Sequence, residues 1–331
     1  MKSSLRFLLA ALAALMLALG ATACGSDDES DSGGDGGGSA SSEPAGGKLI
    51  EKDPANAGKS ITVGSKNFDE QFVLGEIYSQ ALEAAGFKVE KKLNLGSEQI
   101  AYKALKSGQV DAYPEYTGTS LTSFFDVKID DVPKDPDEAY ELTKEEYAKQ
   151  DITALPRTQF ENTYRIVTTT EKQKDLLEGA TTLSEVADMP NAGELSIAGF
   201  PECRQRTDCL LGLKNVYSWT PEFVSDEGKY EPINKDRSDL GFVFSTDGEL
   251  TTGKYAIIED DKSLFPPYNI SFGIRNDALE KIGPKGEEVL LAVQEPLTEE
   301  VMQELNSRAS IDKEEPSAVA EAYLKESGFI E

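Results

Sequence analysis

The chain reads Asp111-Ala-Tyr-Pro-Glu-Tyr-Thr-Gly-Thr119 at the point that decides its fold. The pattern predicts a short strand over Val110–Tyr113 that ends at Pro114, because proline lacks a backbone donor and bends the chain. Gly118 allows the backbone after the bend to approach other groups closely. A strand that ends in a turn with an aromatic ring and a hydroxyl group is typical of the ligand-binding edge of an open α/β sheet. An ordinary strand-to-loop connection is the alternative.

Strand and helix patterns alternate around this stretch. Strand patterns at Ser60–Gly64 and Phe87–Leu93 flank a helical pattern at Phe68–Ala85, and a second helical pattern runs over Ser97–Ser107. This alternation predicts the α/β class with largely parallel sheets. The second half of the chain repeats the alternation, and a length of 331 residues is sufficient for two domains. We therefore predict two lobes, each a mainly parallel sheet flanked by helices, with a cleft between them.

Composition excludes several classes of function. The chain contains no His, which removes Ser-His-Asp and Cys-His catalysis and any histidine metal site. We therefore expect no catalytic residues, no metal site and no cofactor. The formal net charge of −27 should repel nucleic acid, so DNA and RNA are not expected partners.

The N-terminus has the layout of a secretory signal peptide over residues 1–23. Lys2 and Arg6 precede an apolar run, Phe7–Leu19, that is too short to span a bilayer comfortably. Cys24 directly follows Ala-Thr-Ala, which resembles a bacterial lipobox. We predict lipidation of Cys24 and a location on the outer face of the cytoplasmic membrane. A plain cleaved signal with an incidental cysteine is the alternative.

Export also bears on the residues that follow. Residues 24–47 are rich in Gly, Ser and acidic side chains, which predicts a flexible tether. The two remaining cysteines, Cys203 and Cys209, become candidates for a disulfide in an oxidising compartment. Two free thiols are the alternative; a zinc site is disfavoured because no further Cys or His is available as a ligand.

Five motifs then occur in order: Ser65-Lys-Asn-Phe-Asp-Glu-Gln71, Tyr113-Pro-Glu-Tyr-Thr-Gly-Thr119, Asn162-Thr-Tyr164, Ser245-Thr-Asp-Gly248, and Glu259-Asp-Asp-Lys262 with Phe265-Pro-Pro-Tyr268. In this order and spacing they resemble the substrate-binding proteins of osmoprotectant ABC transporters, which bind glycine betaine, choline and related quaternary amines. The resemblance covers residues 60–328. It implies a monomeric binding protein, not an enzyme, that delivers its ligand to the permease of an ABC transporter.

The same resemblance implies a periplasmic-binding-protein fold of type II, in which the chain crosses twice between the lobes. Lobe I would contain residues 48–160 and 269–331, and lobe II would contain residues 161–268.

The resemblance also implies the site. Carried over by position, an aromatic cage for the quaternary nitrogen comprises Tyr116, Tyr164, Phe244 and Tyr268. Phe244 departs from the family, which commonly has Tyr there. The positions that hold the ligand's carboxylate are Lys66, Thr119 and Arg206; Glu202 would orient Arg206, and Gln71 would lie near the pocket. The pair Cys203 and Cys209 is a second departure, and it brackets Arg206.

This set of residues suits the chemistry of a betaine. A quaternary ammonium has no N–H to donate, whereas an aromatic face attracts a diffuse cation without needing a donor. Arg206 offers a bidentate fork and Lys66 a point charge, which should favour a betaine over choline. The alternatives are another cationic solute (choline, carnitine or ectoine), an enzyme on the same fold, and a surface lipoprotein that has lost ligand binding.

Overall fold

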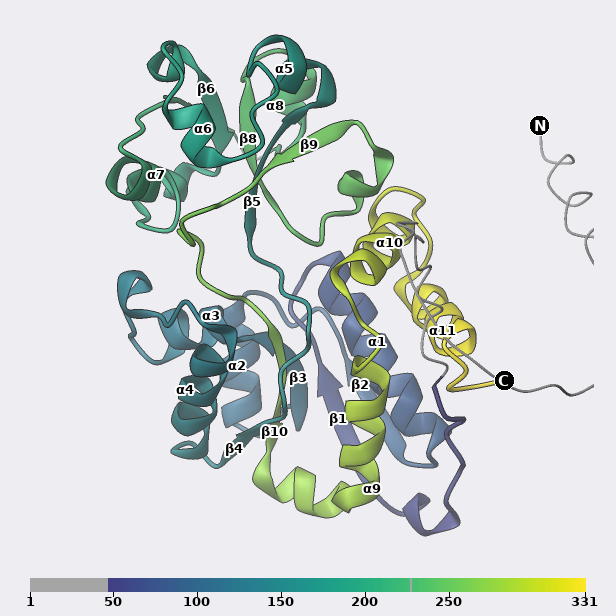
Figure 1. The fold of residues 1–331 in the computed structure, drawn as a ribbon. Helices are drawn as coiled ribbons and strands as arrows, with labels where there is room; N and C mark the ends of the chain where they lie inside the picture. Colours follow the sequence, from purple (N-terminus) through teal and green to yellow (C-terminus); the bar gives the residue numbers. More distant parts are fainter. Residues whose placement is uncertain (1–46, 227) are drawn as a thin grey trace, which may run out of the picture. The chain divides into compact units, whose positions relative to one another are not determined.

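The computed structural model describes residues 47–331 except residue 227, and of Glu202 it describes only the backbone. The predicted signal peptide, the predicted lipidation site Cys24 and residues 25–46 of the predicted tether lie outside the described residues. Within the described part of the chain, no helix has the length and apolar character needed to cross a membrane. Two five-stranded mixed sheets organise this part of the chain (Figure 1).

The first sheet has the strand order β2-β1-β3-β10-β4. Its strands are β1 (Ser60–Gly64), β2 (Lys88–Lys92), β3 (Ala112–Tyr116), β4 (Ile152–Ala154) and β10 (Ile270–Arg275). The helices joined to it are α1 (Asp69–Ala84), α2 (Glu98–Lys106), α4 (Pro136–Ala148) and α9 (Asn276–Gln294). Apolar residues of α1 and α9 form one core with the sheet, and residues of α2 and α4 form a second core.

The second sheet has the strand order β7-β6-β8-β5-β9. Its strands are β5 (Tyr164–Thr169), β6 (Ser196–Gly199), β7 (Glu222–Ser225), β8 (Leu240–Phe244) and β9 (Tyr255–Ile258). The helices that accompany it are α5 (Thr170–Asp175), α6 (Leu183–Ala187), α7 (Leu210–Tyr217) and α8 (Glu231–Asn234). Its core includes the buried Trp219, whose Nε1–H donates to the Ala192 carbonyl at 2.9 Å.

One strand in each sheet runs against the others. β10 is antiparallel to β3 and β4, and β5 is antiparallel to β8 and β9, whereas the remaining pairings are parallel. β5 and β10 are the strands that the chain enters on crossing from the other sheet: residues 155–163 lead into β5, and residues 259–269 lead into β10. The predicted fold class, with two mainly parallel sheets and two crossings, is therefore confirmed. The residue boundaries of the two lobes stay a prediction.

Pro114 does not end the strand, and the sequence prediction was wrong on this point. β3 continues to Tyr116, with Pro114 paired to Phe272 of β10. At the ends of this ladder, the Thr117 N–H donates to Asn269 and the Arg275 N–H donates to Asp111. Hydrogen-bonded pairs in an antiparallel ladder alternate, so they fall on the odd-numbered residues of β3. The even position 114 needs no donor toward β10, and on the other side the parallel ladder with β1 ends at the Val63–Ala112 pair, so proline is tolerated there.

The C-terminal helices connect parts of the chain that belong to different sheets. α10 (Glu299–Ser310) and α11 (Pro316–Glu326) pack on α1 (Figure 1), where Met302 and Leu305 join the core of the first sheet. α10 also contacts the segment after β8: the Gln303 side chain donates to the Ser245 carbonyl at 2.7 Å, and the Asn306 side chain donates to the Thr246 carbonyl at 2.8 Å. α10 therefore braces the two sheets against each other.

Candidate functional site

A cavity of about 790 Å³ is lined by residues that follow β1 and β3, by residues of β5 and β8, and by residues of both crossings. Most of the predicted ligand residues lie in its wall: Tyr116, Tyr164, Phe244, Tyr268, Lys66, Thr119 and Arg206. Gln71 is not in the wall; it is buried, and its Oε1 accepts the Lys66 N–H at 3.1 Å. The structure thus gathers residues from all five motifs around one cavity.

On the side of the first sheet, the cavity has two stacked rings. Tyr116 is the last residue of β3, and Phe68 immediately precedes α1. Their ring centroids are 6.2 Å apart with an interplanar angle of 19°. The Phe68 side chain is 39% exposed, which is unusual for a large apolar residue inside the fold and leaves its face available. Phe68 stands in the first of the five motifs, but no role was predicted for it.

On the side of the second sheet, two further rings stack. Tyr164 begins β5 and Phe244 ends β8, and the two residues are paired across the antiparallel ladder. Cross-strand partners lie close enough for their side chains to touch, and here the ring centroids are 5.2 Å apart with an interplanar angle of 21°. Phe200 lies 6.0 Å from Phe244, centroid to centroid. Strand register therefore places Phe244 beside Tyr164.

The turn after β3 lies against the second crossing. Residues Thr117–Thr119 (α3) and Ser120–Phe124 continue β3 as one helical segment, with Thr119 facing the cavity. A Cβ atom on Gly118 would lie 2.8 Å from the Pro267 carbonyl oxygen and from the Tyr268 ring. The predicted close approach at Gly118 is confirmed, and it fixes the place of Tyr268.

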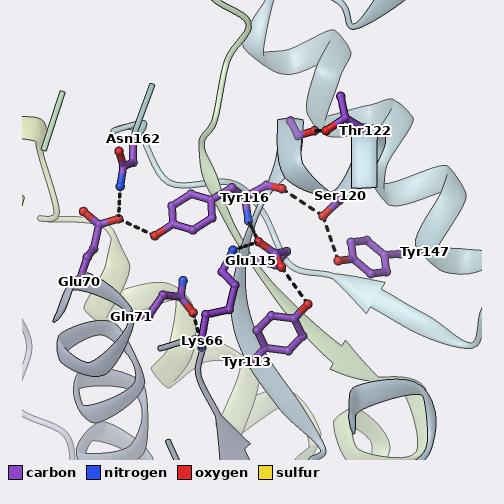
Figure 2. Close-up of polar contacts among 11 residues, drawn as sticks. Lys66, Glu70, Gln71, Tyr113, Glu115, Tyr116, Ser120, Thr122, Tyr147 and Asn162 are labelled. Carbon is purple, nitrogen blue, oxygen red and sulfur yellow. Dashed lines mark hydrogen bonds and ion pairs between the residues drawn. The ribbon is translucent and has the colours of Figure 1, made fainter. Parts of the chain in front are cut away.

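The Lys66 ammonium already has a partner inside the site. It forms an ion pair with Glu115, and both side chains are buried. Glu115 also accepts the Tyr113 hydroxyl at 2.9 Å and the Tyr116 N–H at 2.7 Å (Figure 2). The Lys66 Nζ lies 4.2 Å from the centroid of the Tyr116 ring. The sequence predicted Lys66 as a point charge for the ligand's carboxylate and did not identify Glu115 as its partner.

Arg206 is held by an acid that the sequence did not identify. The guanidinium donates from Nε and Nη2 to the two carboxylate oxygens of Asp208, at 2.8 and 2.5 Å. Asp208 is fully buried and also accepts the Tyr268 hydroxyl at 3.2 Å. The hydrogen bond to Asp208 raises the pKa of Arg206, and burial raises the pKa of the Tyr268 hydroxyl. Asp208 therefore orients Arg206. The role predicted for Glu202, whose side chain the structure does not describe, stays a prediction.

Cys203 and Cys209 form a disulfide, with Cα atoms 5.2 Å apart. The closed loop contains both Arg206 and Asp208, so the bond limits the movement of the segment that carries the guanidinium.

Glu70 connects Tyr116 to distant parts of the chain. Its Oε1 accepts the Tyr116 hydroxyl at 2.7 Å and the Asn162 side chain at 3.0 Å (Figure 2). Its Oε2 accepts the Asn306 side chain of α10 at 2.8 Å. Burial and the charge of Glu70 raise the pKa of Tyr116, which keeps the hydroxyl protonated as a donor. The Tyr116 ring is thus fixed by the first crossing and by α10 through one carboxylate.

A metal centre has no counterpart among the described residues, since no group of three or more His, Cys, Asp or Glu side chains is placed to hold an ion. The cavity offers aromatic faces, a guanidinium, hydroxyl groups and paired charges. Such a wall is suited to reversible binding of a small polar molecule.

Residues 59–326 match the family described as the substrate binding domain of ABC-type glycine betaine transport systems. The chain belongs to this family. A glycine-betaine-binding protein of Pseudomonas aeruginosa is 30% identical over 285 residues, which are 82% of this chain and 89% of that protein. The ergothioneine transport permease/ergothioneine binding protein EgtU of Helicobacter pylori is 26% identical over 82% of this chain and 48% of that protein.

A solved structure leads to the same family. The crystal structure of a glycine betaine/carnitine/choline ABC transporter superposes with a TM-score of 0.72 and is 26% identical, over 80% of this chain and 97% of that chain. As a member of the OpuAC family, the protein is an extracytoplasmic solute-binding component of an ABC transporter for quaternary-amine compatible solutes. The prediction of a binding protein and not an enzyme is confirmed by this membership.

Proposed function

We propose that the protein captures a quaternary ammonium solute that carries a carboxylate, of the glycine betaine kind, and delivers it to the permease of its transporter. The observation that carries this proposal is the shared cavity: the rings of Tyr116, Tyr164, Phe244 and Tyr268 line it together with Arg206. The ring pairs come from different sheets. A solute between them would contact both.

Aromatic faces would hold the cationic end. Each ring contributes roughly 0.5–2 kcal/mol to the binding of a cation, depending on how far water is excluded. A small hydrated ion would lose its hydration shell for little return, whereas a methylated ammonium gains apolar contact as well. Phe68 is a further ring of this wall, stacked on Tyr116. We infer that Phe244, which lacks a hydroxyl, weakens selectivity without abolishing binding.

Arg206 would hold the carboxylate. A guanidinium has five N–H donors in a fixed fork, and Asp208 occupies two of them. The Arg206 side chain is 36% exposed, so the remaining donors are accessible. Thr119 adds a hydroxyl on the same cavity. This arrangement favours a betaine over choline, which has a hydroxyl group where the betaine has a carboxylate.

Binding would close the two lobes on the solute, and the permease would recognise the closed form. We take the lobes as residues 48–160 with 269–331 and residues 161–268. We also propose that the protein is a monomer and that Cys24 anchors it to the outer face of the cytoplasmic membrane.

Isothermal titration of the purified protein with glycine betaine, proline betaine, carnitine, ergothioneine, choline and ectoine tests the ligand class. Tyr116→Ala should abolish binding of every quaternary amine, and Arg206→Ala should weaken betaines more than choline. Arg237→Ala is the matched control, because this exposed arginine pairs with Asp226 outside the cavity.

If choline binds more tightly than every betaine, the proposal that Arg206 holds a ligand carboxylate is wrong, whereas the proposal of the aromatic cage still stands. If none of the quaternary amines binds at millimolar concentration, the proposed ligand class is withdrawn.

A further inference from the structure

Two acids of the sequence motifs have no part in the function proposed above. Glu115 stands in the motif that contains Tyr116, and Asp247 stands in the motif that follows Phe244. They belong to opposite sides of the cavity, one in β3 and the other just after β8. Both carboxylates nevertheless have the same three kinds of partner.

On the first side, the Glu115 carboxylate accepts the backbone N–H of the ring residue Tyr116 at 2.7 Å and the hydroxyl of Tyr113 at 2.9 Å. Its third partner is the Lys66 ammonium, which lies 4.2 Å from the Tyr116 ring centroid and 5.8 Å from that of Phe68. The Glu115 side chain is 1% exposed (Figure 2). A buried charge of this kind persists only with a charged partner.

On the second side, the Asp247 carboxylate accepts the backbone N–H of the ring residue Phe244 at 3.0 Å and the hydroxyl of Tyr230 at 3.2 Å. Its third partner is the Lys229 ammonium, which lies 5.2 Å from the Phe244 ring centroid. Lys229 and Asp247 both line the cavity. The two sheets therefore present the same unit: a ring, a lysine over the ring, and an acid bonded to both.

This unit has an electrostatic consequence for a cationic ligand. Lysine ammonium groups beside Tyr116 and Phe244 would repel a quaternary ammonium at those rings, and the repulsion grows where water is excluded. A carboxylate paired with each lysine cancels most of the positive field of the ammonium group at the distance of a ligand. With the acids in these places, a ring that already lies beside a lysine ammonium could also accept the permanent cation of a quaternary ammonium ligand.

We propose that Glu115 and Asp247 determine specificity by neutralising Lys66 and Lys229, so that the cage admits a permanent cation. The inference rests on the proposed function, since it assumes a quaternary ammonium in this cavity. It predicts a difference between ligands: without the acids, choline suffers the full repulsion, whereas the carboxylate of glycine betaine is attracted by the unpaired ammonium. A purely structural role of the two ion pairs would affect both ligands equally.

The experiment measures association constants of choline and glycine betaine by titration calorimetry for the wild type and two sets of variants. The first set is Glu115→Gln and the double variant Lys66→Met/Glu115→Gln. The second set is Asp247→Asn and the double variant Lys229→Met/Asp247→Asn. Glu141→Gln is the control, an exposed acid paired with Lys144 on α4 outside the cavity. Circular dichroism reports whether each variant folds.

The single variants should weaken choline at least about tenfold, and glycine betaine by a clearly smaller factor, because an unpaired ammonium is left within a few ångströms of the cation. The double variants remove both charges and should bring choline back to within about threefold of wild type, which a merely structural loss would not do. The control should change neither ligand. Should Glu115→Gln fail to fold, the Lys66 double variant and the Asp247 set still decide the question.

Equal losses for both ligands, or no recovery in the double variants, would overturn the specificity role and leave the proposed function intact. Absence of any wild-type binding would overturn both.

Discussion

Asp208 positions two residues of the cavity wall without lining the cavity itself. It is fully buried, and it holds the guanidinium of Arg206 through two hydrogen bonds and the hydroxyl of Tyr268 through a third. The two groups come from different segments of the chain, the disulfide loop and the second crossing. One carboxylate therefore sets the relative position of a cage ring and of the proposed carboxylate anchor.

Asp208→Asn should lower the affinity for betaines by about tenfold and reduce the unfolding free energy by about 1–3 kcal/mol, because a buried ionic hydrogen-bond network loses its charge. Calorimetric titration and urea unfolding measure the two effects. Asp226→Asn is the control: this acid pairs with Arg237 at the surface, so a change within about 0.5 kcal/mol is expected. Unchanged betaine affinity in Asp208→Asn would show that Arg206 does not depend on its partner.

The sequence predicted residues of the cavity wall but not the contacts that hold them; Glu70 and Glu115 stand in the quoted motifs but were given no role. Tyr116, Lys66 and Arg206 lie in the wall as predicted. Some of these contacts depend on tertiary structure: Glu70, which accepts the Tyr116 hydroxyl, also accepts the side chain of Asn306, which is 236 residues away in the sequence. A polar residue such as Asn306, so far from its partner in the sequence, shows no local pattern that would predict the contact. Phe68 could have been found, since it is an aromatic residue inside a quoted motif next to Lys66.

At the scale of elements, local patterns located the helices and strands whose apolar spacing is regular. α1 and α2 begin and end within one residue of their predicted ranges. β10 was not identified, although Ile270, Phe272 and Ile274 alternate with smaller or polar residues. The pairing of β10 explains why β3 runs through Pro114, and that partner is about 160 residues away. A rule that reads proline as a strand end fails when the partner strand needs no donor there.

The brace formed by α10 depends on a glycine. A Cβ atom on Gly248 would lie 2.5 Å from the Ser307 backbone of α10. Gly248→Ala should therefore push α10 away from the segment after β8 and lower the unfolding free energy by about 1–3 kcal/mol, as overpacking does. Thermal unfolding checks this, with Gly193→Ala as the control, because a Cβ there meets nothing within 4 Å. If both variants unfold alike, α10 is not tightly packed on this segment.

For the whole molecule, a solute that binds only the folded chain must stabilise it. At a ligand concentration of one hundred times Kd the gain in unfolding free energy is about 2.7 kcal/mol. Thermal unfolding with increasing glycine betaine should therefore show a rising midpoint in the wild type and no shift in Tyr116→Ala. An equal shift in both proteins would indicate binding outside the cage.

The place of β10 also bears on the order in which the protein folds. The second sheet is built from one continuous stretch, residues 164–258, whereas β10 lies between β3 and β4 of the first sheet. Contacts across long separations must overcome a larger loop-closure entropy, so they form later. The first sheet contains the strands that are synthesised first, yet we expect it to be completed last, because it must wait for β10. Loss of the C-terminal segment would leave the second sheet with all its strands and the first sheet without the strand that joins β3 to β4.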